Sequence, residues 1–291
     1  MSEKIQAQLT IAATPKAVFK ALTQVEDVIQ WFAEHADISI AEKRYDFWGR
    51  FTPEVPDRNQ GRHTLLALEP DRRLKFSWKV RGAETTVEFS LEPQGQSTKL
   101  TLLQEGLPQR QTSQYSFADF WDVSLENLRS WVGRKTVGER CDFSVPKRGN
   151  VRLSIDINAP RETVFEALVN PAQLERYIAE KATVEPRVGG QYSFGWKGGG
   201  PVKILDLVPT EKLSYSWTYD KEQETVVTWT LEGSGGKTQL VLVHSGFAPD
   251  RVSEDYGTGW MGFLNRIKAM VESGPGWKQV TYVATDYAGV A

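Results

Sequence analysis

Residues 84–107 read ETTVEFSLEPQGQSTKLTLLQEGL and residues 224–247 read ETVVTWTLEGSGGKTQLVLVHSGF, so one segment occurs twice in the chain. The two segments align without a gap and share ten identities in twenty-four positions. Apolar and polar side chains alternate in both, as at Val227, Trp229 and Leu231, which is typical of a strand with one buried face. Glycine-containing turns follow at 92–95 and 232–235. Each half is therefore predicted to contain an antiparallel β-hairpin.

The repeat extends beyond this segment in both directions. Residues 13–22 match residues 159–168, and residues 65–78 match residues 204–217. The spacing between the copies shortens between Phe47 and Leu65, so the first copy carries an insertion of eight residues there, rich in Pro, Gly and charge. The chain is therefore predicted to hold two domains of one fold, with these bounds: 1–136, a linker 137–149, 150–274 and a tail 275–291.

Each copy opens with an apolar strand, continues with short helices, and ends with a helix that has one apolar stripe. The stripe contains Trp121, Leu125 and Leu128 in the first copy, and Trp260, Leu264 and Ile267 in the second. Because this stripe must pack on something apolar, we expect the last helix to lie across the concave face of a single antiparallel sheet. The fold class is therefore α+β.

Composition is that of an ordinary globular protein and excludes several classes. The chain has 291 residues, 40% of them hydrophobic and 25% charged. Lys plus Arg number 35 against 37 Asp plus Glu, which disfavours a nucleic-acid partner. Cys141 is solitary, and no apolar run is long enough for a signal peptide or a membrane span. We therefore expect a cytoplasmic protein with no disulfide and no membrane insertion.

Several motifs occur in a characteristic order in the second copy. They are Ala159–Leu168, Val188–Gly190, Pro209–Trp217, Thr238–Phe247 and Gly259-Trp260. In these segments the second copy resembles bacterial proteins similar to the activator of the heat-shock-protein-90 ATPase, within the START-like, birch-pollen-allergen-like (SRPBCC) superfamily. The first copy departs from the pattern in three places: Ala41-Glu-Lys-Arg44 replaces a double glycine, Gln104-Glu105 replaces His-Ser, and Asp119-Phe120 precedes Trp121.

The resemblance implies a tandem pair of helix-grip domains, in which a curved antiparallel sheet wraps around a long C-terminal helix and encloses a cavity. Members of the superfamily mostly bind small hydrophobic molecules, some catalyse cyclisation or hydrolysis, and the eukaryotic namesake acts on a chaperone. Fold follows from this resemblance more directly than function does.

Aromatic and aliphatic residues that fall on the expected inner face are the candidate ligand-binding residues. Trp78 and Trp217, at equivalent positions, could form the floor of a cavity or part of the core, and the sequence leaves both open. The candidates are Phe32, Trp78, Phe89, Trp121 and Leu125 in the first copy, and Tyr177, Tyr192, Phe194, Trp217, Trp229, His244, Trp260 and Leu264 in the second.

Catalytic and metal-binding signals are weak. His35, His63 and His244 are dispersed along the chain, so we expect no metal site, and no motif requires a cofactor. His244 could orient a ligand or act as a general base. We expect instead a structural hydrogen bond at a strand end, because no nucleophile or orienting carboxylate stands beside it in sequence. We predict no catalytic residue.

Three functions remain in view. The first is non-enzymatic binding of a small hydrophobic or amphipathic molecule, chiefly in the second domain. The second is a protein-interaction or chaperone-associated module, which would show an exposed apolar patch and a filled interior. The third, a cyclase or hydrolase, would need a titratable pair inside the cavity. Trp277 and Tyr282 make the tail apolar, so we expect it to plug a cavity or to join an edge strand.

Overall fold

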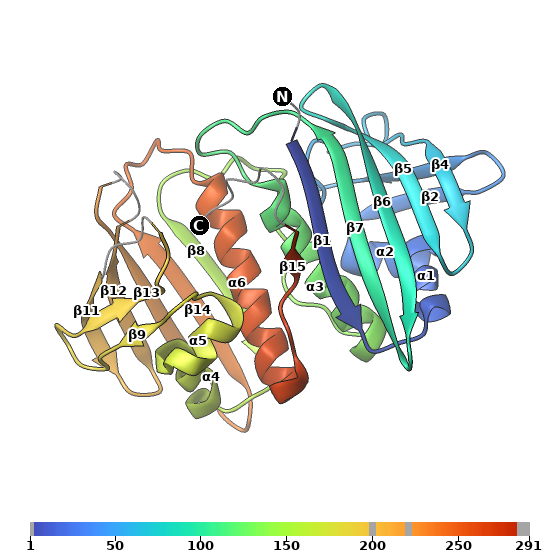
Figure 1. Ribbon diagram of the computed structural model, residues 1–291. Coiled ribbons are helices and arrows are strands. Elements are labelled where there is room, and N and C mark those ends of the chain that lie inside the picture. Colours follow the sequence, from blue (N-terminus) through green and yellow to red (C-terminus); the bar gives the residue numbers. More distant parts are fainter. Residues whose placement is uncertain (1–2, 198–201, 219–222, 284–291) are drawn as a thin grey trace. The chain divides into compact units, whose positions relative to one another are not determined.

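The computed structural model describes residues 3–197, 202–218 and 223–283, which divide into two compact units. We call them the first and second units (Figure 1). Within the described residues, the first unit comprises 3–112, 116–146 and 280–283, and the second comprises 113–115 and 147–279. Each unit is α+β, with a long helix packed against an antiparallel sheet.

The first unit has a six-stranded antiparallel sheet in the order β15-β1-β7-β6-β5-β4 and a separate hairpin, β2-β3. Hydrogen bonds from Tyr45 N to His63 O and from Phe47 N to Gly61 O join the hairpin to the chain before β4. The elements in chain order are β1 (Glu3–Ile11), α1 (Pro15–Thr23), α2 (Val25–Trp31), β2 (His35–Ser39), β3 (Arg44–Trp48), β4 (Leu65–Glu69), β5 (Arg73–Val80), β6 (Ala83–Gln94), β7 (Ser97–Leu107), α3 (Phe117–Arg134) and β15 (Thr281–Tyr282).

The second unit has a seven-stranded antiparallel sheet in the order β8-β14-β13-β12-β11-β10-β9. Its elements are β8 (Val151–Ile157), α4 (Arg161–Val169), α5 (Pro171–Tyr177), β9 (Thr183–Val184), β10 (Gln191–Ser193), β11 (Val202–Val208), β12 (Lys212–Trp217), β13 (Thr225–Glu232), β14 (Thr238–Ser245), α6 (Glu254–Ser273) and a 3-10 turn η1 (Gly274–Gly276).

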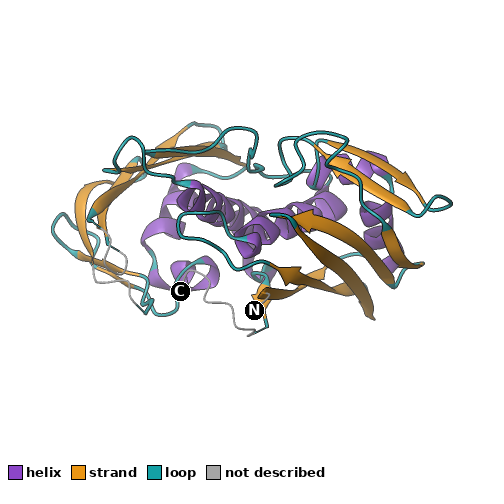
Figure 2. Ribbon diagram, turned by 90° about the horizontal axis from the view of Figure 1, so that it is seen from above, coloured by secondary structure: helices purple, strands orange, loops and turns teal. Residues whose placement is uncertain are grey.

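The sheets place their apolar faces as the alternation predicts. On β13 the side chains of Val227, Trp229 and Leu231 are buried, while those between them are partly exposed. In each unit the sheet curves around helices (Figure 2). The α+β helix-grip architecture expected from the sequence is thereby confirmed, with α3 and α6 as the long helices.

The helix starts follow from local chemistry. The Thr14 hydroxyl accepts a hydrogen bond from Ala17 N, and Pro15 occupies the first helical position of α1, where its missing N–H costs nothing. Asn170 caps α5 by accepting from Ala172 N, with Pro171 next. The Ser116 hydroxyl caps α3 by accepting from the backbone N–H groups of Ala118 and Asp119.

The C-terminal segment returns to the first unit as an edge strand. Tyr282 lies opposite Ala7 and Thr281 opposite Gln8 in an antiparallel pair between β15 and β1. Val283 N donates to Gln6 O at 2.9 Å, and the Tyr282 hydroxyl donates to Ala118 O at 2.8 Å. The tail joins an edge strand, which is one of the two arrangements expected, and Trp277 of the tail is buried in the hydrophobic core of the second unit. Residues 284–291 lie outside the described residues.

No helix in the described part of the chain is long and apolar enough to cross a membrane.

Candidate functional site

All thirteen candidate residues from the sequence are buried. They form two groups, one in each unit, and no residue of either group is more than 8% exposed. The structure thus places the predicted residues together within each copy. Their role in holding a ligand stays a prediction.

In the first unit the candidate rings pack directly on one another. Phe32 stacks on Trp121 with ring centroids 5.7 Å apart and contacts Trp78 edge-on at 6.1 Å. Phe89 meets Trp121 edge-on at 5.8 Å. These separations are those of aromatic pairs in contact, so side chains fill the middle of this interior.

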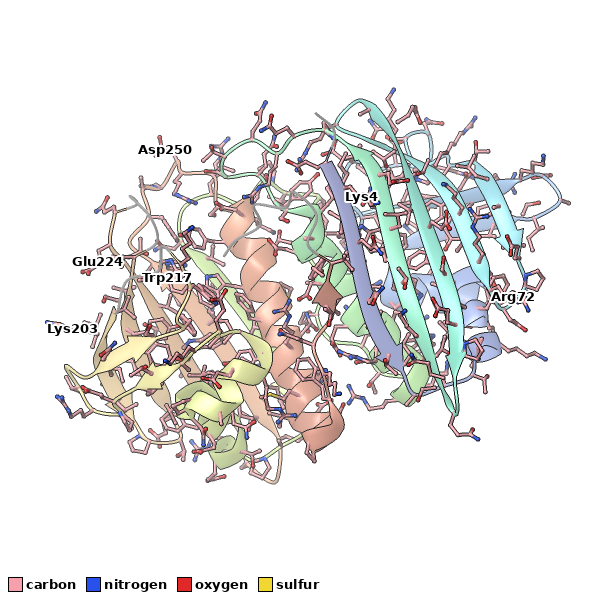
Figure 3. The ribbon with its side chains drawn as sticks, viewed as in Figure 1. Lys4, Arg72, Lys203, Trp217, Glu224 and Asp250 are labelled. Atoms are coloured by element: carbon pink, nitrogen blue, oxygen red, sulfur yellow. The ribbon has the colours of Figure 1, made fainter. Side chains whose placement is uncertain are left out.

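In the second unit Trp260 of α6 is the centre of a similar cluster. Its ring contacts Trp217 at 5.0 Å and Trp229 at 5.8 Å. Trp217, which is labelled in Figure 3, lies at the end of β12. Tyr192 stacks on Tyr215 at 4.4 Å. Ring contacts from Trp260 therefore connect α6 to two strands of the sheet, β12 and β13.

His244 is the centre of a buried hydrogen-bond relay. Trp260 Nε1 donates to His244 Nδ1 at 3.0 Å, and His244 Nε2 lies 2.8 Å from the Thr225 hydroxyl oxygen. The Thr225 hydroxyl in turn donates to Trp217 O at 3.3 Å. Since an indole N–H can only donate, Nδ1 must accept, and the imidazole proton is on Nε2. Both ring nitrogens are thus engaged.

The first unit builds the same relay with glutamine. Trp121 Nε1 donates to Gln104 Oε1 at 2.6 Å, Gln104 Nε2 donates to the Thr85 hydroxyl at 3.2 Å, and that hydroxyl donates to Trp78 O at 2.7 Å. Like the imidazole, the amide offers one acceptor and one donor on opposite sides. One relay therefore serves both copies, with Gln104 in place of His244.

This geometry favours the structural role expected for His244. Burial, assisted by the charge of Arg251, lowers the pKa of His244 to about 3, so the ring stays neutral. A general base needs a free nitrogen facing a substrate, and here both nitrogens face protein groups.

Tyr177 and Tyr192 satisfy the end of helix α4. The Tyr177 hydroxyl donates to Ala167 O at 3.1 Å and the Tyr192 hydroxyl to Leu168 O at 2.7 Å. The last carbonyls of a helix lack partners within the helix, so these bonds are what bring two hydroxyls into an apolar interior. In the first unit Tyr45 donates likewise to Leu22 O at 2.7 Å.

Half-buried aromatic residues form a rim beside Trp217, and sequence reasoning missed them. We call Trp196, Phe247, Tyr256 and Phe263 the aromatic rim of the second unit. Trp196 contacts Trp217 at 5.9 Å and stacks with Phe263 at 6.1 Å. The Trp217 N–H donates to the Tyr256 hydroxyl at 3.2 Å. An aromatic residue that differs between the copies, such as Tyr256 against Phe117, was the signal that could have identified the rim.

The equivalent region of the first unit is covered. Phe117 takes the place of Tyr256 and is buried, and Trp78 is fully buried. The insertion lies over them: His63 contacts Phe47 at 4.0 Å and Trp78 at 6.3 Å. Glu54 of the insertion also forms an ion pair of 4.0 Å with Arg81, whose guanidinium lies 5.7 Å above the Phe117 ring.

The described residues contain no candidate metal site. Among residues 3–197, 202–218 and 223–283, no three His, Cys, Asp or Glu side chains come close enough to hold a metal ion.

Comparison with protein families gives a match to both copies. The family described as "Activator of Hsp90 ATPase homolog 1-like protein" matches residues 12–133 and 158–272. No curated protein matches the chain significantly.

Three solved structures that are similar to the chain each span about one copy. Protein MLL2253 from Mesorhizobium loti is 25% identical, with 43% of this chain and 97% of that chain covered and a TM-score of 0.37. An HSP90 activator from Plasmodium falciparum is 20% identical, with 43% and 96% covered and a TM-score of 0.39. The Aha1 dimer from Colwellia psychrerythraea is 22% identical, with 44% and 98% covered and a TM-score of 0.38.

Proposed function

Since the chain belongs to the family of Activator of Hsp90 ATPase homolog 1-like proteins, we propose that its second unit binds a small hydrophobic or amphipathic molecule at the aromatic rim and Trp217. The first unit serves as a closed copy of the same fold. Binding requires no cofactor and involves no chemical step.

One observation supports this proposal above the others, the difference in exposure between equivalent positions. Tyr256 and Phe247 of the second unit are half-buried, whereas Phe117 and Leu107, which take their places in the first, are 4% and 2% exposed. Partly exposed rings that adjoin a buried aromatic cluster offer apolar area to a ligand. Burying that area contributes about 25 cal/mol of binding free energy per Å².

The cations beside the rim are held by other groups of the protein. Arg251 stacks on Phe247 at 4.8 Å and on Tyr256 at 5.0 Å, and it forms an ion pair of 3.4 Å with Asp255. Arg266 lies 5.5 Å from the Phe263 ring and donates to a backbone carbonyl at 2.9 Å. Neither cation therefore needs a ligand as its partner. A neutral or weakly polar ligand suits this surface.

Two matched tryptophans allow a direct test. Trp196 of the rim and Trp48 of the first unit are both half-buried; Trp48 is the last residue of β3, and Trp196 follows β10. In calorimetric titrations with 2-ethylnaphthalene, Trp196→Ala is expected to weaken binding about tenfold or more, because a large apolar contact is lost. Trp48→Ala should bind as the wild type does. Equal effects of the two variants would refute the rim as the site.

A protein-interaction module is the second candidate, and exposed apolar residues favour it. Leu66 on β4 is 49% exposed, and Leu205 at the equivalent position on β11 is 47% exposed. The family's name makes an Hsp90 chaperone the partner to test. If this module operates, the chain should raise the ATPase rate of an Hsp90, and Leu66→Asp with Leu205→Asp should abolish the increase.

A further inference from the structure

The hydroxyl group of Tyr215 differs from the other buried hydroxyls of the second unit. Tyr215 lies on β12 and is fully buried. Its oxygen accepts a hydrogen bond of 3.2 Å from Trp229 Nε1. Among the described residues, no group accepts the proton of this hydroxyl. Tyr177 and Tyr192, by contrast, both donate to carbonyls of α4.

A buried donor without an acceptor destabilises a fold, so its presence calls for a reason. The first unit avoids the cost, because Phe76 and Phe89 stand where the second unit has Tyr215 and Trp229. Both pairs lie on neighbouring strands in the same register. The same scaffold therefore folds without these two polar groups, and they are a feature of the second unit alone.

The hydroxyl lies on the inner side of the sheet. Trp229, its hydrogen-bond donor, contacts Trp260 of α6 at 5.8 Å. The Tyr215 ring lies 6.2 Å from Phe194, which in turn stacks on Trp196 of the aromatic rim at 4.8 Å. One ring thus separates Tyr215 from the rim where the ligand is placed.

The surroundings decide what the hydroxyl can recognise. Burial raises the pKa of Tyr215, so the group stays protonated and donates. The rings next to it, those of Tyr192 and Phe194, carry no charge, and burying a carboxylate among them would leave a charge without a partner. A neutral oxygen acceptor, such as a ketone or ether, meets the hydroxyl without that cost.

We propose that Tyr215 is the specificity-determining donor of the second unit, and that the ligand is a neutral, largely apolar molecule with a carbonyl or ether oxygen that accepts its proton. This inference rests on the proposed ligand site. Binding requires the Phe194 and Trp196 rings to give way so that the acceptor reaches the hydroxyl.

The test uses two probes of the same shape, 2-acetylnaphthalene, which has a carbonyl, and 2-ethylnaphthalene, which has none. Each is titrated by calorimetry into the full wild-type chain, Tyr215→Phe and the control Tyr192→Phe. The control removes a neighbouring hydroxyl whose proton is already used by Leu168 O. All titrations are done well below the melting temperature of each variant.

Tyr215→Phe is expected to weaken binding of the ketone about 5- to 10-fold, the loss of one hydrogen bond, and to leave the hydrocarbon unchanged. Tyr192→Phe should leave the ratio of the two affinities unchanged. If Tyr215→Phe affects both probes equally, or neither, the role of Tyr215 is refuted while the ligand site stands. If neither probe binds the wild type, the proposed function fails, and the inference fails with it.

Discussion

The Trp260 N–H donates to Nδ1 of His244 across 3.0 Å, and this one bond fixes the tautomer of a fully buried histidine. The first copy forms the equivalent bond between Trp121 and Gln104. Two different residues thus perform one task, which is to connect the long helix to the sheet through a donor and an acceptor. The relay explains why the imidazole tolerates replacement by an amide between the copies.

His244→Gln is accordingly expected to change the free energy of unfolding by less than about 1 kcal/mol, because the amide reproduces both hydrogen bonds. His244→Leu should cost about 1–3 kcal/mol, since it leaves the Trp260 N–H buried without an acceptor. Urea unfolding followed by tryptophan fluorescence measures both. Equal losses in the two variants would show that the relay contributes nothing specific.

Acid should destabilise the protein through its buried histidines. Burial lowers the pKa of His244 to about 3 and that of His63, one in each unit, also to about 3. An unfolded histidine has a pKa of about 6.5, so between these values the unfolded chain binds a proton that the folded chain does not. The stabilisation is therefore complete above about pH 6.5 and is lost as the pH falls towards 3, by on the order of 3–5 kcal/mol for each histidine.

His244→Gln should reduce this loss, because a glutamine does not titrate. Unfolding free energies measured between pH 7 and pH 4 are expected to fall less steeply in the variant than in the wild type. His35, whose ring stacks on Trp48 at the exposed end of β2, provides a matched control as His35→Gln. The account is wrong on this point if the slope of His244→Gln equals that of the wild type.

The C-terminal strand is expected to stabilise the first unit through a single side chain. Tyr282→Phe removes the hydrogen bond to Ala118 O and should cost about 0.5–1.5 kcal/mol. Val283→Ala keeps the backbone bond to Gln6 O and serves as the control, since a residue 40% exposed loses little burial. Chemical denaturation measures both, and an unchanged stability of Tyr282→Phe would show that this hydroxyl contributes nothing to the stability of the first unit.

The duplication made the fold predictable from the sequence. Each copy supplied an independent record of the same alternation, and Trp121 and Trp260 marked the same helix face in both. The pairing of β15 with β1 could not be predicted from the alternation, because a strand of two residues is too short to show a period. The insertion was visible in the sequence as a change in spacing. That it packs on Trp78 could not be predicted, because this contact depends on the tertiary path of the inserted loop.

The site was predictable only in part, for a physical reason. The alternation of apolar and polar residues along a strand shows which side chains point inward, so Trp217, Trp229 and His244 could be placed on the inner face. It does not show which of them remain near the surface. Trp196 and Tyr256 lie outside the alternating strands, and their exposure follows from tertiary packing.

The stoichiometry of ligand binding tests the central claim most directly. The claim is that the second unit is open at its aromatic rim and the first unit is closed by its insertion. Equilibrium dialysis of the full chain against 2-acetylnaphthalene should give one bound molecule for each chain. Two bound molecules would show that the first unit is open as well, and none would contradict the binding site itself.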